Sequence, residues 1–258
     1  MTMEEKILEI KNLSALYDED PVIRDVSLDV YKGEVFCLVG ESGSGKSTLI
    51  KTVCGDLQIK ITQGHIFYKG QCICDSKKSD SRKYLGEEIG FIQQNPEGAF
   101  NPLRKLEVQF KETLKSHGRE LDLVRLGKIF DTLKLKDMDR ILKSRPYELS
   151  GGMNQRIAIA ASFILNPKLL LCDEITSALD VTTAIALTDQ LLKLKNEMDT
   201  SIILVTHNLG IASNIADRVG IMYNGQIVEC ADAKSVLENP QHEYTKRLLR
   251  DVPKLKAI

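Results

Sequence analysis

The sequence predicts an α/β protein with a largely parallel sheet, an antiparallel β segment near its N-terminus and a helical segment inserted in its middle. Residues 35–39 and 169–172 are continuous apolar runs, which are typical of strands buried on both faces of a sheet. Within residues 7–39, alternation of apolar and polar side chains predicts antiparallel strands. Between residues 103 and 165 the apolar period changes to about 3.6, which indicates helices.

The first part of the chain is predicted to be a set of strands that leads into a glycine-rich loop. Turn signals at residues 18–21 and at Lys32 and Gly33 separate the antiparallel strands. The buried strand at 35–39 runs directly into the glycine-rich segment, and residues 48–53 then have a helical pattern.

The middle of the chain is predicted to be helical, and the last part returns to strands. Two sets of apolar residues have helical spacing: Leu106, Phe110 and Leu114, followed by Val124, Ile129 and Leu133. Strand-like runs return at 169–172 and 202–205, each followed by a helical segment. This alternation of strands and helices predicts the largely parallel sheet.

Composition and charge exclude several classes of function. The 258 residues are 43% hydrophobic and 28% charged, which is ordinary for a globular protein. The net charge of -1 gives no electrostatic reason to expect nucleic acid as a partner. Residues 1–10 lack the apolar stretch of a secretory signal, and no run reaches the roughly 18 residues needed to span a bilayer. We expect the protein to stay in the cytosol and to reach a membrane only through another chain.

The six cysteines lack the paired spacing of zinc or iron–sulfur sites and are predicted to be reduced thiols. Cys72 and Cys74 flank Ile73 in an apparent strand, where a period of two predicts that both lie on one face. A redox or metal role for this pair has little support from the sequence.

The glycine-rich segment matches the phosphate-binding pattern G-x-x-x-x-G-K-[ST]. Its residues are Gly40, Glu41, Ser42, Gly43, Ser44, Gly45, Lys46 and Ser47, with Thr48 opening the following helix. Glycines let backbone N–H groups point inward, and the helix N-terminus adds partial positive charge, so the loop can cradle phosphate oxygens. Lys46 is expected to reach the β- and γ-phosphates, and Ser47 to bind Mg²⁺. The alternative is a chance glycine loop, against which the strand before it and the helix after it argue.

The apolar run at 169–172 ends in two acidic residues, as the second acidic motif of a P-loop ATPase does. Asp173, at the end of the strand, can hold Mg²⁺ through water. Glu174 points elsewhere and is placed to polarise the attacking water. Taken alone, the pair could equally be a solvated Asp-Glu at the end of any α/β strand.

Residues 149–156 read Leu-Ser-Gly-Gly-Met-Asn-Gln-Arg and resemble the LSGGQ signature of the ABC ATPase family. Ser150, Gly151 and Gly152 open a helix with a hydroxyl, bare N–H groups and a dipole end, which together make a second anion site. The resemblance implies that this site faces the ATP of a partner subunit. An ordinary helix N-cap would explain Ser150 but not the pair of glycines.

Four further residues resemble family motifs in the family's order. Tyr17 resembles the aromatic residue that stacks on adenine, and Gln94 resembles the glutamine that contacts Mg²⁺ and water. Gln93 precedes it, and the Asn-Pro that follows favours Gln94 as the matching glutamine. Asp180 resembles the aspartate of the D-loop, and His207, after an apolar strand, resembles the switch histidine that contacts the γ-phosphate.

The resemblance implies a single ABC ATPase domain over residues 1–258 that binds ATP and Mg²⁺. It implies a RecA-like nucleotide-binding core with an antiparallel β subdomain at 1–94 and 166–258. The inserted α-helical subdomain, which carries the signature, would occupy 95–165.

Within this family the sequence is most similar to the ATPases of peptide and nickel importers. The segments that carry this similarity are residues 94–102, 149–156, 176–182 and 240–249. Two residues depart from the usual pattern: Ile175 replaces a proline after Glu174, and Asn208 replaces an aspartate. Neither removes a functional group assigned above. Because the chain ends at Ile258 without the cysteine-rich extension of longer peptide-importer members, the shorter nickel or metallophore type is favoured.

The resemblance implies an ATP-hydrolysing subunit that powers import of peptides or of nickel and metallophore complexes. Its partners would be a second ABC ATPase subunit bound head to tail, either the same chain or a paralogue, and two integral-membrane permeases. An extracytoplasmic binding protein would act indirectly, and the chain would be peripheral at the cytoplasmic face of the membrane. The alternative is a soluble ABC ATPase in a metabolic enzyme assembly such as carbon–phosphorus lyase.

Overall fold

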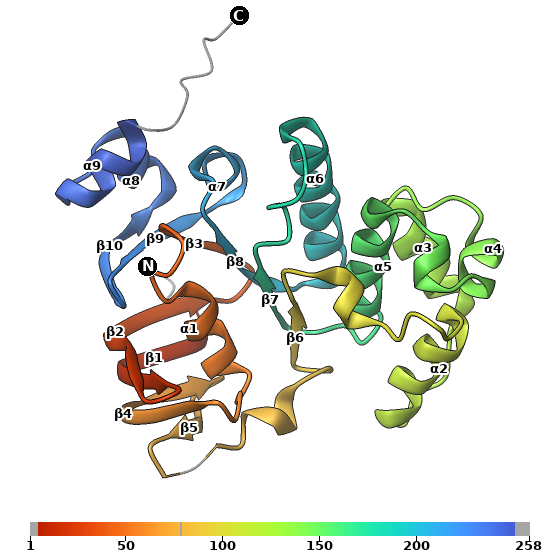
Figure 1. Ribbon diagram of the computed structural model, residues 1–258, viewed down its shortest axis with the longest axis horizontal. Coiled ribbons are helices and arrows are strands. Elements are labelled where there is room, and N and C mark those ends of the chain that lie inside the picture. Colours follow the sequence, from red (N-terminus) through yellow and green to blue (C-terminus); the bar gives the residue numbers. More distant parts are fainter. Residues whose placement is uncertain (1–4, 78, 251–258) are drawn as a thin grey trace, which may run out of the picture. The chain divides into compact units, whose positions relative to one another are not determined.

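The computed structural model describes residues 5–77 and 79–250 of the chain. It divides into two units, which Figure 1 shows in sequence colours. The phosphate-loop unit comprises Met1–Lys83 and Ser201–Ile258, and the helical unit comprises Tyr84–Thr200. Each unit is described by itself. The helical subdomain predicted at 95–165 is a smaller segment than this helical unit, and its boundaries stay a prediction.

The phosphate-loop unit contains the predicted antiparallel sheet. Its strands are β1 (Lys6–Tyr17), β2 (Asp20–Tyr31), β4 (Ile59–Tyr68) and β5 (Gln71–Asp75). They lie in the order β2-β1-β4-β5, and every neighbouring pair is antiparallel. The alternation of apolar and polar residues within residues 7–39 therefore predicted β1 and β2 correctly, whereas β4 lies outside the segment for which it was noted.

The turn between β1 and β2 is a two-residue turn in the left-handed region. Asp18 and Glu19 have φ values of 47° and 70°. Both values suit the mirror-image turns whose twist matches that of antiparallel strands, and Asp tolerates this region better than most residues. The predicted turn at residues 18–21 is confirmed.

A second group of strands in this unit carries the phosphate loop. It consists of β3 (Val35–Val39), β8 (Ser201–Thr206), β9 (Arg218–Tyr223) and β10 (Gln226–Asp232), in the order β10-β9-β3-β8. β3 runs parallel to β8 and β9, and β10 is antiparallel to β9. All residues of β3 and β8 are buried, as their continuous apolar sequences predict.

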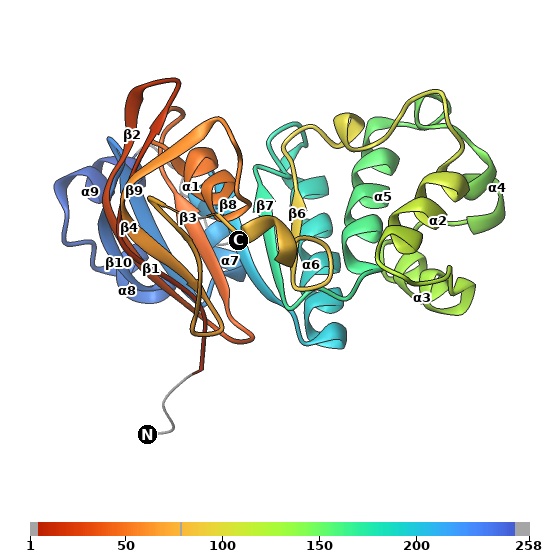
Figure 2. The same ribbon diagram turned by 90° about the horizontal axis from the view of Figure 1, so that it is seen from below.

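The described residues of the phosphate-loop unit also form α-helices. They are α1 (Lys46–Val53), α7 (Leu209–Ile215), α8 (Ala233–Glu238) and α9 (Glu243–Arg250). Figure 1 and Figure 2 show α8 and α9 beside β10. The last helix, α9, therefore lies next to the strands that carry the phosphate loop (Figures 1 and 2).

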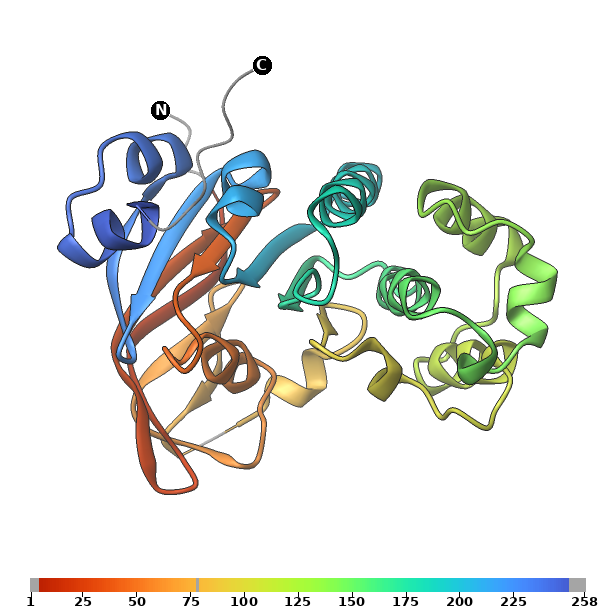
Figure 3. The same ribbon diagram turned by 45° about the horizontal axis from the view of Figure 1, so that its top comes forward.

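The helical unit is built around one central helix. Its elements are the parallel strands β6 (Ile89–Ile92) and β7 (Leu169–Asp173), the helices α2 (Leu106–Ser116), α3 (Leu123–Thr132), α4 (Met138–Lys143), α5 (Gly151–Phe163) and α6 (Val181–Met198), and the short turns η2 (Pro96–Ala99) and η3 (Pro146–Glu148). Figures 2 and 3 show α5 between the two strands and the helices α2 to α4. The helical residues predicted between 103 and 165 are thus α2 to α5.

Aromatic and aliphatic side chains form the core of the small helices. Leu106, Phe110 and Leu114 are all buried on one face of α2, as their spacing predicts. The ring of Phe110 meets that of Phe130 of α3 edge-on, with 6.3 Å between centroids. Val124, which also has helical spacing, lies in α3 but is 71% exposed. It sits in the first turn of α3, where the next residues supply the buried face.

The prediction that Cys72 and Cys74 share one face of their strand is wrong. Cys72 is exposed, whereas Ile73 and Cys74 are both buried. The cause is a bulge: Cys74 pairs with Ile66 and Cys72 pairs with Phe67, so β5 has one residue more than β4 across this step. A bulge of this kind breaks the period of two and sends two consecutive side chains to one face.

Within the part of the chain that the model describes, no helix combines the length and the apolar character that a bilayer span requires.

Candidate active site

The phosphate loop and His207 emerge at the same edge of the parallel strands. Val39, the last residue of β3, pairs with Thr206, the last residue of β8, and the two strands are parallel. Gly40 and His207 follow them directly, so both lie at the carboxyl edge, where α/β sheets bind ligands. Asn208 accepts hydrogen bonds from the N–H groups of the first turn of α7. An amide oxygen replaces the family's carboxylate oxygen in this cap without loss of the acceptor.

Glycines shape the phosphate loop as its pattern predicts. Gly43 and Gly45 have φ values of 81° and 103°, which residues other than glycine rarely adopt. Lys46 is buried and its Nζ donates to the carbonyl oxygens of Gly40 (2.8 Å) and Glu41 (2.7 Å). The ammonium group is thus held inside the curled loop, where the phosphates of a nucleotide would need a positive charge. The loop therefore fits the phosphates of a nucleoside triphosphate.

Gly40 is required by the close approach of another strand's backbone. A Cβ atom at this position would lie 2.2 Å from the carbonyl oxygen of Met222. Nearby, the carbonyl oxygen of Ser44 accepts a hydrogen bond of 3.0 Å from the N–H of Gly225. β9 and the turn after it thus fix the loop from one side. The exposed residues Ser42 and Gly43 form its open side.

The remaining residues of the motif open the helix that follows. α1 begins at Lys46, and Ser47 and Thr48 are half-buried in its first turn. A helix N-terminus directs unpaired N–H groups and partial positive charge at an anion. This arrangement is the predicted one.

Tyr17, the predicted adenine-stacking residue, is the last residue of β1. Its side chain is half-buried, and its hydroxyl donates to Oε1 of Gln58 at 3.2 Å. Gln58 has no sequence signal that marks it as part of the site. The hydrogen bond fixes the orientation of the ring in the phosphate-loop unit.

The C-terminal helix α9 contacts the phosphate loop, which the sequence did not predict. The hydroxyl of Tyr244 accepts a hydrogen bond of 3.0 Å from the N–H of Glu41. Arg247, one turn later, pairs its guanidinium with the Glu41 carboxylate at 3.0 Å. The ring of Tyr244 packs on Tyr223 of β9 at 4.1 Å between centroids. Residues 240–249 marked a subgroup in the sequence, and in the structure they anchor the second residue of the loop.

In the helical unit, Gln94 and Glu174 meet at the carboxyl edge of β6 and β7. Ile92 pairs with Cys172 in parallel register, so the residues that follow the two strands lie side by side. Nε2 of Gln94 donates to Oε2 of Glu174 at 3.3 Å. Asp173, the last residue of β7, is 3% exposed. The structure therefore brings together the predicted catalytic glutamate and the predicted Q-loop glutamine.

The two glycines of the signature share a pocket with this pair. The pocket has a volume of about 440 Å³ and is lined by Gln94, Asn95, Gly151, Gly152, Gln155, Glu174, Ile175, Ser177, Ala178 and Leu179. A cavity of this size with carboxylate, amide and bare backbone groups suits a polar ligand. The signature and the D-loop segment thus border the carboxylate predicted to activate water.

Ser150 and Asp180 both cap helices. The hydroxyl of Ser150 accepts from the N–H of Met153 at 3.3 Å at the start of α5. The carboxylate of Asp180 accepts from the N–H of Thr183 at 3.0 Å and from its hydroxyl at 2.6 Å. The bond from the Thr183 hydroxyl holds the pKa of Asp180 below its usual range. Both side chains are exposed, and their predicted contacts with nucleotide stay a prediction.

The predicted site residues fall into two groups, one in each unit. The phosphate-loop unit holds Tyr17, residues 40–48 and His207, and the helical unit holds Gln94, Ser150, Gly151, Gly152, Asp173, Glu174 and Asp180. Within each unit, parallel strand ends account for the main groupings.

Comparison with known proteins identifies the family of this chain. Residues 23–177 match the model of the ABC transporter family. The chain is 37% identical to the dipeptide transport ATP-binding protein DppD of Bacillus subtilis, over 97% of this chain and 78% of that protein. It is 38% identical to the metal-staphylopine import system ATP-binding protein CntD of Staphylococcus aureus, over 96% and 94%.

Solved structures show the same fold. cbiO1 of Clostridium perfringens, part of the ABC transporter complex cbiONQ, superposes with a TM-score of 0.78 at 24% identity over 92% of each chain. An ATP-binding cassette solved as a dimer in a post-hydrolysis state with ADP and Pi has a TM-score of 0.74 at 26% identity, over 88% of this chain and 98% of that one. The chain belongs to the ABC transporter family and is an ATP-binding, ATP-hydrolysing subunit.

Proposed function

We propose that this chain hydrolyses MgATP to power import of peptides or of metal–metallophore complexes, as a peripheral subunit at the cytoplasmic face of the cell membrane. The observation that carries the catalytic part is the hydrogen bond of Gln94 to Glu174 at the mouth of a pocket bordered by Gly151 and Gly152. Relatives named for dipeptide transport and for metal-staphylopine import support the class of cargo.

Each residue has a chemical role in this proposal. Lys46, whose Nζ lies inside the loop, binds the β- and γ-phosphates. Ser47, Gln94 and Asp173 would hold Mg²⁺, which neutralises charge on the phosphates when bound. Glu174 accepts a proton from the attacking water, and Gln94 holds that carboxylate in place.

Two further residues of the phosphate-loop unit contact the nucleotide in this proposal. His207 contacts the γ-phosphate from the same edge as the phosphate loop. Tyr17 stacks on adenine, its ring held by the bond to Gln58.

A second ABC ATPase subunit, the same chain or a paralogue, completes each site. Ser150 and its two glycines open α5, so their N–H groups and the helix dipole present an anion site to a nucleotide held by the partner. Two subunits arranged head to tail would enclose two nucleotides. One chain by itself is then a half-site that hydrolyses ATP slowly.

A groove in the helical unit supports docking on membrane permeases. It has a volume of about 460 Å³ and is lined by Phe91, Ile92, Gln93, Gly98, Ala99, Phe100, Arg104, Gln109, Glu112, Thr113, Ala158, Ala161 and Ser162. Its lining combines apolar side chains with the Arg104–Glu112 ion pair, and this mixture suits a short amphipathic segment of a partner. Because Gln93 lines the groove and Gln94 bonds to Glu174, movement of a docked permease would reach the catalytic carboxylate directly.

The experiment is mass spectrometry of proteins that co-purify with the tagged chain from detergent-solubilised membranes of its source cells. Two polytopic permeases with an ATPase partner are expected. Ala161→Arg fills the groove and is expected to lose the permeases. Val124→Arg, at an exposed position in the first turn of α3, adds the same charge and is expected to keep them. Recovery only from the soluble fraction with metabolic enzymes would overturn the importer and promote a soluble ATPase assembly.

Cargo is then decided by uptake. Cells that lack the chain are expected to lose uptake either of a labelled dipeptide or of a labelled metal–metallophore complex, and to regain it with the intact gene. Loss of neither would contradict both cargo classes.

A further inference from the structure

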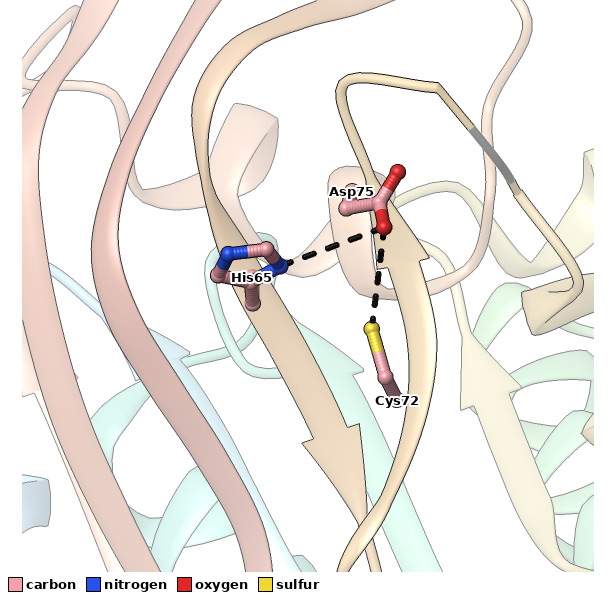
Figure 4. A group of neighbouring side chains, drawn as sticks. All are labelled: His65, Cys72 and Asp75. Carbon is pink, nitrogen blue, oxygen red and sulfur yellow. Dashed lines mark hydrogen bonds and ion pairs between the residues drawn. The ribbon is translucent and has the colours of Figure 1, made fainter.

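We propose that His65, Cys72 and Asp75 form a binding site for a divalent metal ion of the zinc class. The three side chains lie on the β4–β5 hairpin of the antiparallel sheet (Figure 4). None of them takes part in the nucleotide chemistry described above, so the proposal does not rest on the importer function.

The bulge in β5 is what brings the three side chains to one face. In a regular strand, Cys72 and Asp75 are three residues apart and would point to opposite faces. The bulge places the Ile73 and Cys74 side chains together in the interior, which returns Asp75 to the outer face that Cys72 occupies. His65 is the direct partner of Asp75 on β4. Bulges are known to re-aim side chains at functional sites.

The distances are close to those of a metal site. Nδ1 of His65 lies 3.9 Å from Oδ2 of Asp75, and Sγ of Cys72 lies 4.0 Å from the same oxygen. All three ligand atoms lie within 4.8 Å of one another. Bond lengths of about 2.0–2.3 Å in a tetrahedral zinc site place ligand atoms roughly 3.5 Å apart. The side chains of His65 and Cys72 are exposed, so small changes of their rotamers can close the remaining gap.

The carboxylate is already oriented for this role. Its other oxygen, Oδ1 of Asp75, accepts a hydrogen bond of 2.7 Å from the N–H of Lys77. This bond directs Oδ2 at His65 and Cys72. Outer hydrogen bonds of this kind fix the geometry of metal ligands and raise their affinity.

The ligand types select the metal. One thiolate, one imidazole and one carboxylate suit Zn²⁺ and its neighbours Co²⁺, Ni²⁺ and Cu²⁺, whereas Mg²⁺ and Ca²⁺ take oxygen ligands. Three protein ligands leave one tetrahedral position for water or for a ligand from another molecule. Lys11, the residue opposite His65 on β1, is paired with Glu9 at 2.8 Å, which offsets its positive charge beside the site. Binding displaces the proton of the Cys72 thiol into solvent.

Cobalt provides the direct test, because a thiolate bound to Co²⁺ gives a charge-transfer band in the near ultraviolet. The full chain, reduced and free of nucleotide, is titrated with Co²⁺ and then with Zn²⁺ in competition with a chromogenic chelator. One equivalent of Co²⁺ is expected to produce the band, and Zn²⁺ to abolish it by displacement.

Variants identify the ligands. Cys72→Ser is expected to lose the band, and His65→Ala and Asp75→Asn to weaken Zn²⁺ binding more than about tenfold, because even loss of an outer partner costs 10–100-fold. Cys230→Ser is the matched control, since Cys230 is also exposed, and it is expected to keep the band. ATPase activity measured with Mg²⁺ but without added Co²⁺ or Zn²⁺ should be unchanged in Cys72→Ser, which shows that the variant is folded. Absence of the band in the intact chain, or its survival in Cys72→Ser, would overturn the proposal and leave a surface ion pair.

Discussion

Glu174 has a backbone conformation that its side chain disfavours. Its φ of 47° lies in the left-handed region, which costs a residue other than glycine of order 1–3 kcal/mol. The turn after β7 offsets part of this cost through the hydrogen bond from the N–H of Ser177 to the carbonyl of Glu174. The conformation ends the strand and turns the carboxylate toward Gln94 rather than into the sheet. Strain at this residue is therefore consistent with its proposed catalytic role.

Replacing Glu174 by glutamine removes the proton acceptor while its size is kept. ATP hydrolysis by the purified complex is expected to fall at least about 100-fold, because general bases contribute 10²–10⁴-fold. Binding of a fluorescent ATP analogue should be unchanged, since the substitution keeps the size of the side chain and leaves the residues of the phosphate loop intact. Glu197→Gln, on the exposed face of α6, is the control and should retain full activity. Undiminished hydrolysis in Glu174→Gln would refute the assignment.

Gly40 is predicted to tolerate no side chain at all. In Gly40→Ala, the new Cβ would meet the Met222 carbonyl oxygen at 2.2 Å, so the loop must move away from β9. We expect ATP affinity to fall more than about tenfold and the melting temperature to drop, because the contact is with rigid backbone.

The control for this substitution is Gly127→Ala. Gly127 lies within α3, and a Cβ there would meet nothing within 4 Å. Alanine should stabilise the helix by roughly 0.5–1 kcal/mol and leave nucleotide binding unchanged. Equal ATP affinity in both variants would show that the loop does not depend on its packing against β9.

At the scale of elements, strands and helices were predictable where a local period was present. The buried runs at β3, β7 and β8 and the face of α2 follow from spacing alone. The bulge in β5 was not predictable, because it depends on pairing with β4 across the hairpin. The contact of α9 with the phosphate loop was also out of reach, since Glu41 and Tyr244 are separated by 203 residues in sequence.

The contact of α9 predicts an effect of Tyr244 on nucleotide affinity. Burial raises the pKa of Tyr244, so the hydroxyl stays neutral and accepts from the Glu41 N–H. Tyr244→Phe removes the acceptor and is expected to weaken ATP binding about fivefold, the equivalent of a hydrogen bond of about 1 kcal/mol. KM for ATP should rise while kcat changes little, because the bound loop is held by the phosphates.

Two substitutions on the same helix serve as comparisons. Arg247→Gln should have less than about a twofold effect, since its pair with Glu41 is exposed and exposed pairs contribute little. The Lys246 side chain bonds to Glu243 and makes no described hydrogen bond to the loop. Lys246→Gln should therefore have no effect on ATP binding. A change in kcat alone in Tyr244→Phe would contradict a role in holding the loop.

At the scale of the whole molecule, the sequence motifs predicted which residues belong to the candidate site. Their positions depend on how the whole chain folds. Gln94 and Glu174 lie 80 residues apart, and their proximity follows from the parallel pairing of β6 with β7. The strand at 169–172 was predicted from its apolar run, whereas β6 was not predicted as a strand. The order of the strands and the division into two units depend on contacts throughout the chain, which no single motif encodes. The residues proposed to bind phosphate from the loop lie in one unit, and the signature and the proposed catalytic carboxylate lie in the other.

This division predicts that binding and turnover can be lost separately. Lys46→Ala removes the ammonium group inside the loop, so the isolated chain should bind ATP at least about tenfold more weakly. Ser150→Arg blocks the start of α5, where the partner's nucleotide is proposed to dock, so the isolated chain should bind ATP normally. In the complex purified with its partner subunit, phosphate release should nevertheless be lost at the sites that use this signature. Lys51→Ala, on the same helix as Lys46, is the control for loss of charge and should change neither property. If Ser150→Arg abolished ATP binding by the isolated chain, the signature would serve the nucleotide of its own chain, and the head-to-tail arrangement would be wrong.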